Sequence, residues 1–162
     1  MSRQGLIGAA VALLVLAGIA AVALYFNRGA HMELVGEIKK VRTHDLDGTS
    51  SFVVVDFHVT NPSDFPFVVR QVEVSLFNGE KWVQGETVAD VDARGLFEYY
   101  RSIGPKYNDT FKVRDQLPSK ESGDRMVSAR FELQESRVDL RKGLKVRITE
   151  SASQVTELVE KR

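Results

Sequence analysis

The segment Phe52–Thr60 constrains the fold of this 162-residue chain more than any other feature. Its apolar and polar side chains alternate: Val53, Val55, Phe57 and Val59 have one parity, and Val54, Asp56, His58 and Thr60 have the other. A period of two is typical of a β-strand that packs on one face. We therefore expect an antiparallel sheet whose first parity lies in a core and whose second parity mostly faces water.

Asn61 and Pro62 end this predicted strand. Proline cannot donate to a sheet ladder, and it pushes the residue before it towards extended geometry. The side-chain oxygens of Asn61 and its neighbours are expected to accept hydrogen bonds from loop amides. The Asn-Pro pair therefore predicts a corner between two strands.

The next strand changes parity along its length, with Phe67 and Val69 before the change and Val72 and Val74 after it. Such a change predicts a β-bulge near residues 70–71. Asn78 followed by Gly79 then predicts a tight hairpin. Other strands are predicted over residues 34–42, 81–89, 110–114, 126–134, 144–148 and 154–160. Seven or eight short strands favour an all-β fold, an immunoglobulin/fibronectin-III-like antiparallel β-sandwich.

Residues 5–26 carry no charged side chain. As a helix they would be about 33 Å long, close to the roughly 30 Å of a bilayer's hydrocarbon core. We expect a single N-terminal transmembrane helix within residues 1–28, a linker at 29–33 and the β-sandwich at 34–162. A cleaved signal peptide is the alternative, because Ala21-Val22-Ala23 resembles a cleavage triplet.

The side of the membrane is predicted from two opposing signals. Basic residues after the apolar run favour a cytoplasmic C-terminal domain. A short head, an apolar run and a folded domain are instead the usual layout of an exported protein. We favour a periplasmic or extracellular C-terminal domain.

Charge and cysteine content exclude several classes of function. Removing Arg3 and Arg28 from the 22 basic residues leaves 20 against 22 acidic ones beyond residue 28. This balance gives no electrostatic footprint for nucleic acid. The absence of cysteine removes disulfides, thiolate nucleophiles and thiolate metal sites.

Two groups of polar residues are candidates for chemical sites. His44-Asp45-x-Asp47 lacks the further ligands and the closing Glu of a calcium loop, so we expect a solvated turn. Asp56 and His58 share one strand face, but no nucleophile motif accompanies them. We predict no catalytic residue, no metal, no cofactor and no enzyme activity.

The stretch VVVDFHVTNPSDFPFVVRQVEVSLFNG resembles the core of the type 2 late embryogenesis abundant family, also called the WHy domain. The matching positions are Asn61, Pro62, Phe65, Phe67, Val72, Val74 and Gly79. The resemblance implies a seven-stranded sandwich without catalysis. It also implies a role in stress tolerance or in binding and stabilising proteins near a membrane. The segment from Asp90 to Pro118 is longer and more aromatic than the family pattern, which fits a divergent bacterial branch.

That long segment supplies the candidate binding surface. Asp90 or Asp92 is expected to cap a short helix, with Phe97 and Tyr100 closing the open end of the sandwich. Tyr99 would then face solvent and, with Tyr107 and Trp82, could contact a partner. Asn61, Pro62 and Gly79 are expected to be structural.

Two functions follow from these expectations. The first is a non-enzymatic binding or protein-stabilising module, held in the membrane by residues 5–26, with a protein partner. The alternative is a structural subunit of a cell-envelope or secretion assembly, because Gly5, Gly8, Ala9 and Ala12 would permit close helix packing.

Overall fold

A computed structural model describes residues 13–22 and 33–161 of the chain. The chain divides into two units, Met1–His31 and Met32–Arg162. Residues 13–22 are helical. Among the described residues, no helix is both long and apolar enough to cross a membrane. The predicted anchor at 5–26 and the predicted linker at 29–33 lie largely outside the described residues, so both stay predictions.

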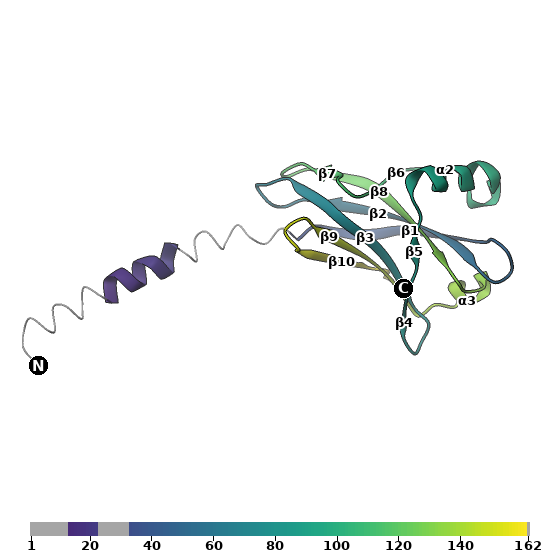
Figure 1. The fold of residues 1–162 in the computed structure, drawn as a ribbon, viewed down its shortest axis with the longest axis horizontal. Helices are drawn as coiled ribbons and strands as arrows, with labels where there is room; N and C mark the ends of the chain where they lie inside the picture. Colours follow the sequence, from purple (N-terminus) through teal and green to yellow (C-terminus); the bar gives the residue numbers. More distant parts are fainter. Residues whose placement is uncertain (1–12, 23–32, 162) are drawn as a thin grey trace, which may run out of the picture. The chain divides into compact units, whose positions relative to one another are not determined.

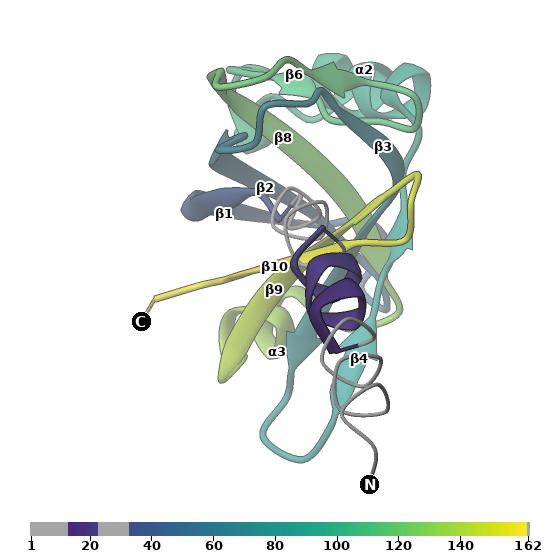
Figure 2. The same ribbon diagram turned by 90° about the vertical axis from the view of Figure 1, so that its left-hand side faces the viewer.

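The second unit is a sandwich of two sheets (Figures 1 and 2). One sheet has the order β1-β2-β8-β5, with β6 beside β8, and the other has the order β10-β9-β3-β4, with β7 beside β3. All neighbours are antiparallel except β6 and β8. The elements are β1 Val35–Asp45, β2 Ser51–Thr60, β3 Phe67–Phe77, β4 Trp82–Gln84, β5 Glu86–Thr87, α2 Asp90–Tyr99, η1 Arg101–Ile103, β6 Asp109–Thr110, β7 Gln116–Leu117, β8 Ser122–Phe131, α3 Glu135–Asp139, β9 Gly143–Glu150 and β10 Val155–Val159.

The core between the sheets follows the predicted parity of β2. Its buried apolar residues include Val53, Val55, Phe57 and Val59 of β2, which meet residues of β3 and β9 across the interior. The register of β3 against β9 shifts between Val69 and Gln71, so the predicted bulge is confirmed. The shift keeps Val69, Val72, Val74 and Leu76 all buried in this core.

The hairpin after β3 turns at Asn78 and Gly79, as predicted. Gly79 has a φ of 104°, in the region that favours glycine. The side-chain oxygen of Asn78 accepts hydrogen bonds from the amides of Glu80 and Lys81, both at 3.0 Å. The single strand predicted over residues 81–89 is two short strands, β4 and β5, which pair with different sheets.

Candidate functional site

Residues 88–117 are here called the inserted segment. Its first part covers the outer face of the β1-β2-β8 sheet, and its last part reaches β3 of the other sheet, with which β7 pairs. A second buried cluster lies between the first part and the sheet: Phe52, Val54 and Met126 of the sheet pack against Ala93 of α2 and Ile103 of η1. Phe97 and Tyr100 pack against the same cluster.

The outer face of β2 is therefore apolar and covered at its centre, and the prediction that it is mostly wet was wrong. Phe97 and Tyr100 cover a sheet face; the expectation that they close the end of the sandwich was also wrong.

A buried ion pair fixes the inserted segment to the sheet. Arg42 of β1 donates to one carboxylate oxygen of Asp56 of β2, through Nη2 at 2.9 Å and Nε at 3.2 Å. Its remaining Nη1 donates to the carbonyls of Ile103 at 3.0 Å and Pro105 at 2.8 Å. The other Asp56 oxygen accepts from Asn108 at 2.9 Å. Arg42 and Asp56 are 9% and 4% exposed, so one guanidinium joins two strands to the inserted segment in a water-poor interior.

Two aromatic rings flank the same guanidinium. The carbon of the Arg42 guanidinium lies 5.4 Å from the ring centre of Phe97 and 5.1 Å from that of Tyr107. A cation at this distance over a ring is attracted by the electrons of its face. Arg42 therefore positions Tyr107, although 60% of Tyr107 remains exposed.

The start of α2 is held by a second polar cluster. The Asp90 carboxylate accepts from Thr110 at 2.5 Å, from Arg94 at 2.8 Å and from Lys106 at 3.0 Å. These partners, and the Thr110 hydroxyl above all, hold the pKa of the Asp90 carboxyl well below its usual range. The N-cap is Ala89, without a side-chain cap hydrogen bond, so the predicted cap at Asp90 or Asp92 was wrong. Asp90 instead ties α2 to β6.

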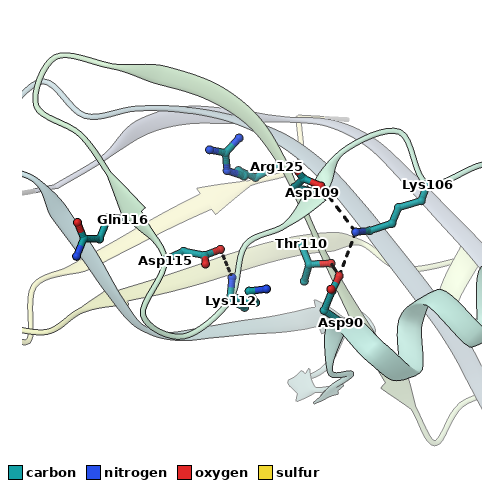
Figure 3. Close-up of a pocket in the computed structure, with 8 residues that line it drawn as sticks. All are labelled: Asp90, Lys106, Asp109, Thr110, Lys112, Asp115, Gln116 and Arg125. Atoms are coloured by element: carbon teal, nitrogen blue, oxygen red, sulfur yellow. Dashed lines mark hydrogen bonds and ion pairs between the residues drawn. The ribbon is translucent and has the colours of Figure 1, made fainter.

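A hollow of about 420 Å³ lies beside this cluster, and Figure 3 shows its walls. It is lined by Asp90, Lys106, Asp109, Thr110, Lys112, Asp115, Gln116 and Arg125. Its three acidic and three basic side chains balance in number. Several of these charged groups already have partners within the protein. Asp90 has three, and Asp115 accepts a hydrogen bond from the backbone amide of Lys112 at 3.0 Å. The hollow has the composition of a surface ion-pair network.

The polar residues predicted to share a strand face or a turn have separate partners, and Nδ1 of His44 lies 3.1 Å from the Ser102 hydroxyl. Asp56 faces Arg42, whereas Nδ1 of His58 lies 2.7 Å from Asp124. The Asp47 carboxylate accepts from Thr49 and Ser50 within its own turn, which holds the pKa of Asp47 well below its usual range. In the described part of the chain, no three His, Cys, Asp or Glu side chains are grouped to hold a metal ion.

The three aromatic residues predicted to contact a partner are all exposed but do not lie together. Tyr99 at the end of α2 is 79% exposed, and its ring meets that of Tyr100 edge-on at 4.7 Å. Trp82 is 45% exposed and belongs to β4 of the other sheet, where it packs beside Phe77. Only Tyr99 and Tyr107 therefore belong to the inserted segment.

The corner at Asn61 and Pro62 is structural, by a mechanism that differs in part from the prediction. Asn61 is fully buried, and its amide nitrogen donates to the carbonyls of Phe65, Leu117 and Pro118 at 2.8, 3.0 and 3.1 Å. Its oxygen accepts from the backbone amide of Ser63, as predicted, at 3.0 Å. Asn61 therefore mainly satisfies carbonyls, and it joins the corner to the end of the inserted segment.

Arg42, which holds the inserted segment to the sheet, was not predicted from the sequence as a site residue. Arg42 of β1 and Asp56 of β2 lie on the outer face of the same sheet. Arg42 pairs with Val54, so Asp56, two residues further along β2, lies diagonally across from Arg42. The sequence signal for this contact is a pair of opposite charges at diagonal positions on neighbouring strands, beside the apolar residues Phe52 and Val54. It could be recognised only once the inserted segment was known to cover this face.

Comparison with known proteins adds little. No protein-family model matches the chain, and no curated protein matches it. A solved structure of a conserved hypothetical protein from Bacillus anthracis is similar at 13% sequence identity, with a TM-score of 0.39, over 78% of this chain and 87% of that one. A similarity of this size carries no argument about function. The resemblance to the type 2 late embryogenesis abundant family stays a prediction.

Proposed function

We propose that the chain is a non-catalytic, membrane-anchored module that binds a protein partner on its inserted segment. The observation that carries this proposal is the exposure of Tyr99 and Tyr107, 79% and 60%, on a segment fixed by the buried Arg42. Tyrosine combines a large apolar area with a polar hydroxyl and is enriched in protein interfaces.

Fixing the segment in advance favours binding. Ordering loops and side chains on association opposes affinity, and a segment already held by the protein avoids that loss. Here the Arg42 contacts hold Ile103 and Pro105, and the Asp90 contacts hold Lys106 and Thr110. Both tyrosines therefore stand on backbone that is set before a partner arrives.

The cellular setting in the proposal comes from the sequence. Residues 5–26 anchor the chain, and the immunoglobulin- or fibronectin-III-like domain lies on the periplasmic or extracellular side. Resemblance to the WHy domain supports a role in stabilising proteins under stress. The module needs no cofactor, since its action is association.

A structural subunit of an envelope or secretion assembly is the second candidate. The small residues Gly5, Gly8, Ala9 and Ala12 favour it, because they would let partner helices approach closely. Replacing Gly5 and Gly8 by Leu is expected to disperse a detergent-resistant oligomer in that case. A solitary binder would be unaffected by the same change.

Photocrosslinking in intact membranes tests the leading proposal. A photoreactive phenylalanine replaces Tyr99, or, as a control, Leu140, which is 75% exposed and outside the inserted segment. We expect a discrete protein adduct from position 99, identified by mass spectrometry, that weakens when Tyr107→Ala is added. Protease accessibility of the same membranes reports the side on which the domain lies. Equal adducts from positions 99 and 140 would contradict the proposal.

A further inference from the structure

The outward face of α2 carries an apolar row with a gap in its middle. Val91, Gly95 and Tyr99 are four residues apart, so they lie along one side of the helix. Val91 and Tyr99 are 74% and 79% exposed. The opposite side, with Ala93, Leu96, Phe97 and Tyr100, packs on the sheet. The outward row therefore takes no part in holding α2 to the domain.

Nothing within the domain requires glycine at the middle of this row. A Cβ placed on Gly95 meets no atom within 4 Å, and Gly95 is not among the glycines with positive φ. Gly95 is thus unlike Gly85, where a Cβ would lie 2.6 Å from the ring of Phe131. A glycine inside a helix makes that helix less stable than an alanine would. The space above Gly95 is open on the side that faces away from the sheet.

Charge borders the row on both sides. Asp92 and Glu98 are exposed on α2. In angle around the helix axis, Asp92 lies next to Tyr99, and Glu98 lies next to Val91. Within the described residues neither carboxylate has a hydrogen bond or an ion pair, whereas Arg94 is already paired with Asp90 at 2.8 Å. The row is therefore flanked by one unpaired carboxylate on each side, with the paired Arg94 beside Glu98.

We propose that this face of α2 binds an amphipathic, basic α-helix of the partner protein. Helices pack by placing the side chains of one into the gaps between rows of the other. The gap over Gly95, between Val91 and Tyr99, accepts one apolar side chain of such a helix. Lysine or arginine residues beside it pair with Asp92 and Glu98. This inference rests on the proposed function and names the chemistry of its partner.

The test uses the full chain in micelles of an uncharged detergent and two synthetic helical peptides. Both have about 18 residues, long enough for some helix in isolation, and leucine along one face. Lysine flanks the leucines in one peptide, and glutamate flanks them in the other. The photoreactive residue again replaces Tyr99, with Leu140 as the matched control position. The control corrects for attachment of either peptide to the detergent.

The lysine peptide is expected to crosslink at position 99 at least about fivefold more than at position 140, and the glutamate peptide at the background level. Salt at about 0.5 M reduces the lysine signal, because it screens exposed charge pairs. Gly95→Leu, which fills the gap, lowers the lysine signal to background. Gly95→Ala lowers it in part while raising the melting temperature by about 2–4 °C.

Equal yields from the two peptides, equal yields at the two positions, or an unchanged yield in Gly95→Leu and Gly95→Ala would overturn the inference. The proposed function has a separate readout, the protein adduct formed at position 99 in intact membranes. If that adduct persists while the peptides show no preference, the basic helix is wrong and the binding module stands. If Gly95→Leu fails to fold, Gly95→Ala decides the result.

Discussion

The guanidinium of Arg42 and the carboxylate of Asp56 lie 2.9 Å apart on neighbouring strands, and the rest of the same guanidinium holds the backbone at Ile103 and Pro105. One buried cation therefore serves both the sheet and the segment that covers it. The segment that carries the exposed tyrosines is therefore held by a residue that is itself buried.

Arg42→Ala is expected to destabilise the domain by about 3–5 kcal/mol, because it leaves the Asp56 carboxylate buried without its cation. Urea unfolding of the full chain, followed by the fluorescence of the single tryptophan, measures the change. The double variant Arg42→Met/Asp56→Leu removes both charges and should recover a large part of the loss. A loss in Arg42→Ala below about 1 kcal/mol would show that the pair is not buried as described.

Asn61→Ala should lower the free energy of unfolding by about 1–3 kcal/mol, because the carbonyls of Phe65, Leu117 and Pro118 each lose one hydrogen bond from the Asn61 amide. Asn61→Asp is the informative companion: it keeps an oxygen facing Ser63 but replaces the NH₂ donor by a second oxygen. We expect Asn61→Asp to destabilise at least as much as Asn61→Ala. If Asn61→Asp is tolerated in urea unfolding, the oxygen matters and the donated hydrogen bonds do not.

Asp90 gives a pH dependence whose sign follows from its lowered pKa. A carboxyl whose pKa is lower in the folded state stabilises the fold above its unfolded pKa, about 3.9. That contribution falls as the pH falls from there through the folded pKa. The wild-type protein should therefore have a higher free energy of unfolding than Asp90→Asn at pH 7 in urea unfolding. This difference should shrink below about pH 4. Asp92→Asn is the control, because Asp92 is exposed on the same helix and, among the described residues, has no hydrogen bond or ion pair. A difference that is the same at pH 7 and pH 3 would contradict the Asp90 contacts.

Tyr99→Ala should change the free energy of unfolding by less than about 0.5 kcal/mol, since the side chain lies outside the packed cluster. Phe97→Ala, two residues earlier, removes a ring that packs edge-on against Phe52 at 6.2 Å. It should lower stability by at least about 2 kcal/mol. Thermal unfolding of the two variants side by side measures this contrast. Equal losses would place Tyr99 in the core.

The sequence was informative where local patterning decides the structure. The alternation over Phe52–Thr60 identified the core face, and the parity change identified the bulge between Val69 and Gln71. The solvent exposure of Tyr99 followed from helical spacing alone. Each of these depends on residues close together in the chain.

The wrong predictions concern places where segments far apart in the sequence come into contact. Val54 and Asp56 have the pattern of a wet face, yet the inserted segment from over thirty residues later buries them. Asp90 has the sequence position of a cap, but Thr110 and Lys106 compete for its oxygens. The spacing of strands along the sequence does not show which sheet face a long insertion packs against. The hydrogen bonds from Arg42 to that insertion could therefore not be predicted.

Hydrogen exchange of the full chain at single-residue resolution tests most directly whether the inserted segment is a fixed part of the domain. The amides of Ala93, Tyr100 and Ile103 donate to backbone carbonyls of this segment, and the amide of Phe111 donates to β8. We predict that all four exchange at least about a hundredfold more slowly than in an unfolded chain. Exchange of these amides at unfolded rates, while β2 and β3 stay protected, would contradict the account.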